Sequence, residues 1–414
     1  MSSAQSDKAS LVASERRLVA ASFLIFLGFQ TTYFVGIIGL VTYELGANAY
    51  IVSAMVVILN LVLVAAGGVA GVIVDRIGPR ITIAASCALM AIEGFLPLAL
   101  PMGYPLLLTL AVLDGVVAGV GGAAREAYPR FLTDDARELL KTNSWINTAS
   151  NLSVIVGPTL GGAITHFTGT SLSVFFAMPL VAVPAAIIVW LTPELLDLSA
   201  VRTDEQSRRE EARGGFWHEL AAGVRATFSS KTLAEIFLIY FLGFFAYGAF
   251  DSLESIFYRD VLKVGNEWMG WLSACAGIGA TAGSLLVLRV PTRKLSVRMI
   301  AALLLVTGIG SMIYVGTSSV AVAVVGQLIT GLGFGAMPPV KNTLVQRDCD
   351  PSAIGRVTSV MQVGANSAGT LPLLVAPFIA DAFGVQQTLF AASALVALIA
   401  AVFVWISGRG GKRA

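Results

Sequence analysis

The sequence predicts an all-α polytopic membrane protein with twelve transmembrane helices in two six-helix halves. Of its 414 residues, 56 % belong to the hydrophobic set and only 13 % are Asp, Glu, Lys or Arg, against roughly 25 % charged residues in a soluble domain. The mean hydropathy of +0.81 requires many membrane-length apolar runs, because a helix needs about 20 apolar residues to cross the hydrocarbon layer. One long polar segment separates six of these runs from the other six.

Short polar connections separate the apolar runs from one another. The runs are continuous and rich in Gly and Ala, whereas the strands of a membrane β-barrel would alternate over ~10 residues. The predicted spans are 18–41, 49–74, 81–100, 105–124, 142–166, 171–192, 233–258, 267–288, 297–315, 319–340, 354–380 and 386–407.

Polar segments divide the chain into five parts, and the distribution of basic residues predicts the orientation of the chain in the membrane. Placing the N-terminus inside leaves only Arg259 and Lys263, of 27 Lys and Arg residues, on the outer face, as expected when basic loops stay in the cytoplasm. We therefore expect a multi-pass protein of the cytoplasmic (inner) membrane with both termini in the cytosol. The parts are a cytosolic tail at 1–17, the first six-helix half at 18–192, a cytosolic central loop at 193–232, the second half at 233–407 and a cytosolic tail at 408–414.

The second part of the central loop has helical periodicity. Apolar residues between Phe216 and Phe228 are spaced near one helical face, which is consistent either with an amphipathic helix on the inner membrane surface or with a plain linker.

The two halves resemble each other weakly, as in transporters built from repeats. AGVGGA at residues 118–123 recurs as TGLGFGA at 330–336, and THFTG at 165–169 recurs as ADAFG at 380–384.

The loop between the second and third spans reads GVIVDRIGPR at residues 71–80. It resembles the signature G-x-x-x-D-R-x-G-R-R/K of the major facilitator superfamily, with Pro79 as the main departure. The resemblance implies a gating motif made of Gly71, Asp75, Arg76, Gly78 and Arg80. In that family Asp75 would lie near the start of the eleventh span in a cytoplasmic latch, and Arg76 and Arg80 would find acidic partners. A basic turn that follows the charge rule is the alternative.

The fifth span contains SVIVGPTLGG at residues 153–162. This string resembles the G-x-x-x-G-P-x-x-G-G pattern of exporters in the same superfamily, with Ser153 replacing the first Gly. Pro158 removes a helical hydrogen bond, and Gly157, Gly161 and Gly162 offer a smooth face to a neighbouring helix. Generic packing of small residues is the alternative.

Segments 129–151 and 345–374 are similar to one exporter branch, which includes the enterobactin exporter and macrolide efflux proteins. The arginine that many proton-coupled drug antiporters carry in the fourth span is replaced here by Ala111. A proton mechanism based on that arginine is therefore not expected.

Four carboxyl groups lie at membrane depth, where ionisable residues are functional candidates because a charge costs at least ~2.5 kcal/mol near the bilayer centre. Asp114 is the leading candidate for proton coupling, followed by Asp251 and by Glu93, with which Asp114 could instead form a structural hydrogen bond. Glu254 is expected to reach the outer headgroups. Three basic residues at the inner ends of spans four and ten, Arg125, Arg130 and Lys341, are expected to be membrane anchors rather than ligands.

Polar and aromatic side chains on several spans suit the binding of a large, partly apolar solute. Each could equally serve helix packing. The candidate substrate-binding residues are Gln30, Tyr33, Asn60, Asn147, Asn151, Tyr240, Tyr247, Gln362 and Asn366.

These features favour a secondary transporter that exports a small organic molecule by alternating access, with protons as the expected coupling ions. The expected partners are a small-molecule substrate, protons and the lipid bilayer, with no nucleic acid, and the chain is expected to act as a monomer. Three scattered cysteines and two isolated histidines predict no disulfide framework, no metal site and no cofactor. The alternatives are an uptake permease or facilitator of the same fold and, more remotely, a membrane sensor or enzyme.

Overall fold

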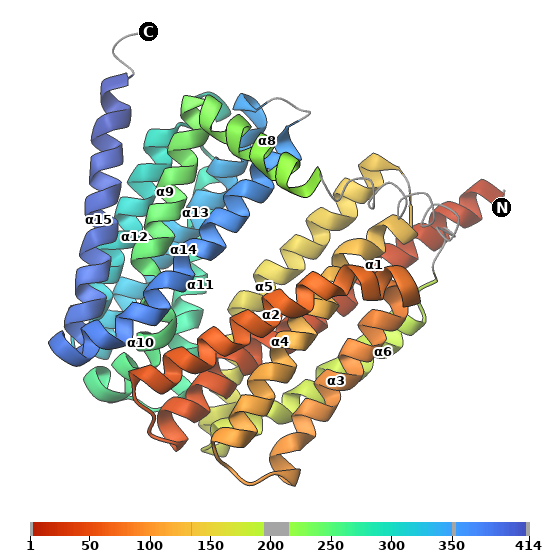
Figure 1. The fold of residues 1–414 in the computed structure, drawn as a ribbon, viewed down its shortest axis with the longest axis horizontal. Coiled ribbons are helices and arrows are strands. Elements are labelled where there is room, and N and C mark those ends of the chain that lie inside the picture. The colour runs from red at the N-terminus through yellow and green to blue at the C-terminus, as the bar shows by residue number, and fades with distance from the viewer. Residues whose placement is uncertain (1–2, 134, 194–214, 350–352, 411–414) are drawn as a thin grey trace. The chain divides into compact units, whose positions relative to one another are not determined.

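The computed structural model describes residues 3–133, 135–193, 215–349 and 353–410, and this part of the chain is helical without strands (Figure 1). In the first half the helices are α1 (Ser3–Thr31), extended by η1 (Thr32–Ile38) and η2 (Leu40–Glu44), α2 (Ala49–Ile77), α3 (Pro79–Ala99), α4 (Tyr104–Ala127) with η3 (Tyr128–Phe131), α5 (Ala136–Thr168), η4 (Ser171–Phe176) and α6 (Ala177–Trp190). In the second half they are α8 (Gly215–Ser229), α9 (Lys231–Tyr247), α10 (Phe250–Ile256), η6 (Phe257–Leu262), α11 (Glu267–Leu288), η7 (Thr292–Lys294), α12 (Val297–Val315), α13 (Val320–Asp348), α14 (Ile354–Phe383) and α15 (Val385–Gly410).

Eleven helical segments of the described chain are long and apolar enough to cross a membrane. The remaining predicted span, 142–166, lies within α5, which is 33 residues long but carries polar side chains such as Asn147 and Asn151 in its first part. The first span begins earlier than predicted, because α1 is already helical from Ser3 through most of the expected tail.

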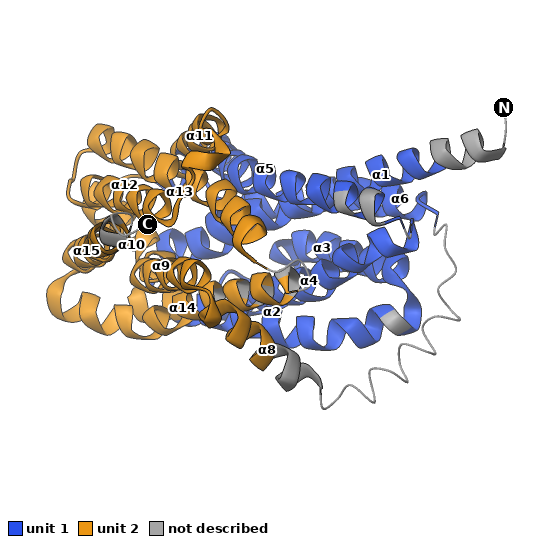
Figure 2. Ribbon diagram, turned by 90° about the horizontal axis from the view of Figure 1, so that it is seen from above, with its two compact units in different colours: residues 1–47, 54–207, 265–271 blue, residues 48–53, 208–264, 272–414 orange. Residues whose placement is uncertain are grey.

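The chain forms two compact units, which Figure 2 shows in different colours. Unit 1 comprises residues 1–47, 54–207 and 265–271, and unit 2 comprises residues 48–53, 208–264 and 272–414. The units follow the predicted halves except at the starts of α2 and α11, where a short segment belongs to the other unit.

In unit 1, α1 packs against α5 and α6, and α3 packs against α4 and α6. Leu18 of α1, Met90 of α3 and Met178 of α6 meet in its core, each at most 1 % exposed. Gly94 lets α3 approach the junction of η4 and α6 closely, since a Cβ there would lie 2.7 Å from the Phe175 carbonyl oxygen of η4 and 3.1 Å from the Met178 Cβ of α6.

In unit 2, α12 contacts both α13 and α15, and α9 contacts α14 (Figure 1). The core of this unit includes the fully buried side chains of Ile236, Ile300, Leu344 and Val357.

Both sequence repeats occupy equivalent structural positions. A Cβ on Gly119 of α4 would lie 2.5 Å from the Leu63 carbonyl oxygen of α2, and a Cβ on Gly331 of α13 would overlap the Ala276 carbonyl oxygen of α11. Gly169 and Gly384 have φ angles of +76° and +91° where α5 and α14 end, a conformation that favours glycine. The same two backbone requirements therefore recur in each half.

The central segment is helical at α8 (Gly215–Ser229), so the helical interpretation of residues 216–228 is confirmed. Gly223 packs against α14, where a Cβ would lie 3.0 Å from Val360. The placement of α8 on a membrane surface stays a prediction.

Candidate functional site: buried carboxyl groups and an aromatic pocket

The gating motif spans the end of α2 and the start of α3. Gly78 has a φ of +84° directly before α3, which explains the need for glycine. Among the described residues, Arg80 does not form the ion pair with an acidic partner that the sequence suggested. Its guanidinium donates a hydrogen bond to the Trp190 carbonyl oxygen and lies 4.9 Å above the Trp190 ring, so it connects α3 to α6. Asp75's side chain and residues 350–352 lie outside the described part, and the latch stays a prediction.

The glycines of the export motif lie where helices of unit 1 approach each other closely. A Cβ on Gly157 would lie 2.5 Å from the Gln30 Cβ, and one on Gly161 would lie 2.9 Å from the Val35 Cβ, both on the extended α1 segment. A Cβ on Gly162 would lie 2.9 Å from the Gly270 Cα of α11. The motif thus presents one backbone face to α1 and another to residues 265–271.

Asn266 attaches the same short segment to unit 1, and sequence analysis did not identify it. Its Nδ2 atom donates to the Val35 carbonyl oxygen at 3.2 Å and to the Ser171 hydroxyl. The side chain is only 6 % exposed. A lone Asn between two spans carries no sequence signal for such a contact.

Glu93 and Asp114 form a buried pair of carboxyl groups in unit 1. Both residues are 0 % exposed, and Asp114 lies close enough to Glu93 for their charges to interact. None of the four carboxyl oxygens has a hydrogen-bond partner in the described part of the chain. The alternative that Asp114 hydrogen-bonds to Glu93 is therefore not what this structure shows.

Arg125 is buried, contrary to the expectation of an interfacial anchor. It is 5 % exposed, and its guanidinium carbon lies 4.1 Å from the centre of the Phe26 ring of α1. Arg125 is eleven residues after Asp114 on α4, which corresponds to about three helical turns and to the same helix face.

Glu254 is not directed to the outer headgroups as the sequence suggested. Its Oε1 atom accepts hydrogen bonds from the Tyr314 hydroxyl at 2.7 Å, the Tyr258 hydroxyl at 3.0 Å and the Gln327 amide at 3.1 Å. These donors come from α12, η6 and α13, so one carboxylate joins three helical elements of unit 2. Asp251, one turn earlier on α10, is exposed.

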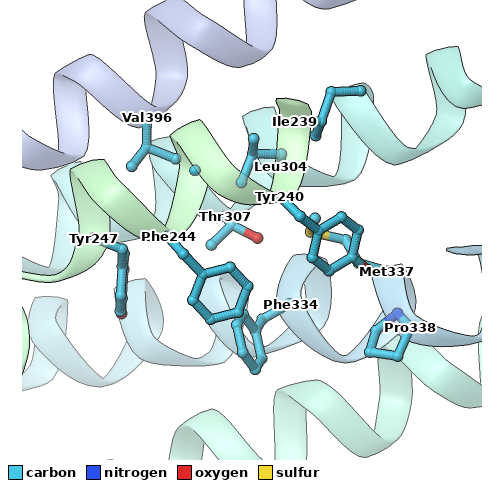
Figure 3. A pocket seen from close by; sticks show the side chains of 11 residues that line it. Ile239, Tyr240, Phe244, Tyr247, Leu304, Thr307, Phe334, Met337, Pro338 and Val396 are labelled. Atoms are coloured by element: carbon cyan, nitrogen blue, oxygen red, sulfur yellow. The ribbon is translucent and has the colours of Figure 1, made fainter. Parts of the chain in front are cut away.

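Tyr240 and Tyr247 are the two candidate binding residues that the structure brings to one pocket (Figure 3). The pocket is about 70 Å³ in volume and lies within unit 2 between α9, α12, α13 and α15. The Phe244 ring stacks on Tyr240 at 6.1 Å and meets Phe334 edge-on at 6.0 Å. Three lining side chains carry an oxygen, those of Tyr240, Tyr247 and Thr307, and the rest of the lining is apolar.

The other candidate binding residues are not gathered at this pocket. Gln30 lies at the α1–α5 contact, and Tyr33 stacks on Phe29 at 5.8 Å in the π-helical end of the first span. Asn60 donates to the Val56 carbonyl oxygen at 2.9 Å within its own helix. Asn147 and Asn151 are exposed on α5. The side chains of Gln362 and Asn366 lie outside the described part.

The sequence profile of the Major Facilitator Superfamily matches residues 18–373. The multidrug efflux pump Tap of Mycolicibacterium fortuitum is 27 % identical over 349 residues, 82 % of each chain, and that of Mycobacterium tuberculosis (strain ATCC 25618 / H37Rv) is 27 % identical over 69 % of this chain and 67 % of its own.

Solved transporter structures share the fold at low identity. A point mutant of the peptide transporter POT has a TM-score of 0.70 at 13 % identity, covering 97 % of this chain and 95 % of its own. A point mutant of the nucleoside transporter NupG has a TM-score of 0.67 at 13 % identity, covering 94 % of this chain and 98 % of its own.

Proposed function

Since the chain belongs to the Major Facilitator Superfamily and is a multi-pass membrane transporter rather than an enzyme, we propose that it exports small, partly apolar organic molecules by alternating access in exchange for protons. Relatives named multidrug efflux pumps at 27 % identity support the outward direction. The resemblance of the string at residues 153–162 to the exporter pattern is a second argument for this direction. The proposal assigns the chain to the cytoplasmic membrane as a monomer with both termini in the cytosol.

The buried pair of Glu93 and Asp114 carries the proton part of the proposal. Ionising a carboxyl group away from water costs several kcal/mol when no cation or hydrogen-bond donor compensates. Both groups are 0 % exposed, and neither has a hydrogen-bond partner among the described residues. Two such neighbours cannot both be charged without repulsion. The pair is therefore suited to hold a proton in this conformation and to release it in one that admits water.

The proton supplies a sufficient driving force for such a cycle. One charge moving down 100 mV releases about 2.3 kcal/mol, which corresponds to a concentration ratio of about fifty. Release of the proton from Asp114 to the cytosol would accompany the outward movement of the solute. No step requires a metal or a cofactor.

The first experiment identifies a cargo and the direction of its flux. We expect an efflux-deficient host carrying this chain to become more resistant to some antibiotics, dyes or siderophores in a growth screen. Inverted membrane vesicles with an acidic interior should then accumulate the labelled hit. Net flux in the opposite direction would instead favour the uptake permease.

The second experiment tests Asp114 in proteoliposomes with the same cargo. Asp114→Asn imitates the neutral acid permanently, so it should retain cargo exchange without a gradient but lose accumulation driven by a pH gradient. Glu126→Gln is the matched control, because Glu126 is an exposed carboxylate on the same helix. Gradient-driven accumulation that survives in Asp114→Asn would reject this residue as the coupling site and leave Asp251 as the next candidate.

A further inference from the structure

A cation and a phenol lie together at one end of the aromatic pocket in unit 2. The Lys341 Nζ atom is 5.0 Å from the centre of the Tyr240 ring. Lys341 is half-buried and forms no ion pair within the described chain. The Tyr240 hydroxyl is buried and likewise has no hydrogen-bond partner there. The ammonium thus lies over the ring whose hydroxyl has no acceptor among the described residues.

These donors are continuous with the apolar lining. Tyr240 itself lines the pocket together with Met337 and Pro338 of α13. Lys341 follows Met337 and Pro338 by four and three residues, which places it on the same face of α13, one turn further along the helix. Phe244 and Phe334 lie between Tyr240 and Tyr247 in the lining of the pocket (Figure 3). The pocket thus offers an aromatic surface with a positive charge beside it, at Tyr240.

The charge at this position favours one kind of ligand. An ammonium group and a phenol hydroxyl both donate hydrogen bonds, and such bonds are strongest when the acceptor is an anion. The same ammonium repels a cationic headgroup and so discriminates between ligands of equal shape. The Tyr240 ring compensates part of the cost of holding Lys341 away from water.

We propose that Lys341 and Tyr240 form the anion-binding end of a substrate subsite whose aromatic pocket takes the apolar part of an amphipathic organic anion. This inference rests on the export function proposed above, because the bound anion is a substrate only if the chain transports it. The pocket of about 70 Å³ is smaller than the ~300 Å³ or more of a drug-sized site. It therefore accommodates one apolar end of a larger molecule.

Equilibrium binding to the purified full chain in nanodiscs tests the subsite without any gradient. The two radiolabelled probes are 3-phenylpropionate and phenethyltrimethylammonium, which share a phenyl ring and differ in the sign of their charge. We expect the wild type to bind the anion in preference to the cation. Lys341→Gln should weaken anion binding about tenfold, as for the loss of a hydrogen bond to a charged group. Lys341→Arg should retain most of it.

Two further variants separate this effect from misfolding and from general surface charge. Tyr240→Phe removes only the hydroxyl and should weaken anion binding about threefold. Lys294→Gln removes an exposed positive charge in unit 2 and should leave binding unchanged. The Tyr240→Phe result remains decisive if Lys341→Gln fails to elute as a folded protein in gel filtration.

Anionic phospholipid has the same chemistry as a soluble amphipathic anion, so nanodiscs of phosphatidylcholine alone and with phosphatidylglycerol distinguish the two sources. Competition by phosphatidylglycerol would support the anion site with lipid as its occupant, and lack of competition would support a soluble occupant. Equal binding of both probes, binding of neither, or binding unaffected by Lys341→Gln and Tyr240→Phe would overturn the proposal. Preferred anion binding without pH-driven export would instead reject only the transport function.

Discussion

Replacing Glu254 with alanine removes the acceptor that joins three helical elements of unit 2. Its Oε1 atom is 2.7 Å from the Tyr314 hydroxyl, 3.0 Å from the Tyr258 hydroxyl and 3.1 Å from the Gln327 amide. Tyr258 and Tyr314 are 0 % exposed and Gln327 is 4 % exposed, so the substitution takes an acceptor away from three buried donors. We therefore expect Glu254→Ala to destabilise unit 2.

The size of this effect follows from the number and type of the bonds. Hydrogen bonds between membrane helices average about 0.6 kcal/mol, whereas those to a charged group in soluble proteins contribute about 1.5–3 kcal/mol. Three bonds give about 2 kcal/mol from the first value, and the unsatisfied buried donors raise the cost of Glu254→Ala to about 2–5 kcal/mol. Glu254→Gln retains a carbonyl oxygen as acceptor and should cost about 1 kcal/mol.

Thermal unfolding of the purified chain, followed by intrinsic fluorescence at a fixed scan rate, measures this difference. Glu254→Ala should lower the apparent Tm by several degrees. The control is Asp251→Ala, because Asp251 is an exposed carboxylate one turn earlier on α10. In a double-mutant cycle, Tyr314→Phe should cost less in the Glu254→Ala background than in the wild type. An unchanged Tm for Glu254→Ala, or strictly additive effects in the cycle, would refute the network.

Two further predictions concern the helices of unit 1, one on a close helix contact and one on a proline inside a helix. Gly119→Ala should destabilise the chain by about 1–3 kcal/mol, because its Cβ would lie 2.5 Å from the Leu63 carbonyl oxygen; Gly68→Ala, with open space around its Cβ, should not, and equal Tm values would contradict the packing. Pro158→Ala restores a helical hydrogen-bond donor inside α5 and should reduce transport at normal expression, whereas wild-type flux in this variant would remove the argument for a functional role of Pro158.

Helix positions were predictable because each depends on a contiguous stretch of sequence. The predicted span 267–288 coincides with α11 (Glu267–Leu288), and 297–315 coincides with α12 (Val297–Val315). A membrane span is defined by about 20 apolar residues in a row, and no distant residue is needed to recognise it. The early start of α1 at Ser3 was missed because the polar first residues lack that apolar signal.

The sequence by itself also determined the family, since its ordered motifs are local strings. It selected Glu93 and Asp114 as well, because a carboxyl group within an apolar run can be recognised from the sequence alone. Only the tertiary structure decided which polar groups have partners. It joined Glu254 to Tyr314, 60 residues away, and Lys341 to Tyr240, 101 residues away, and it left Glu93 and Asp114 without hydrogen bonds from the described side chains. The physical reason is that the partner of a polar side chain depends on which helix faces meet. Close contacts such as that of Gly119 with Leu63 determine which faces meet, and helical periodicity alone does not specify these contacts.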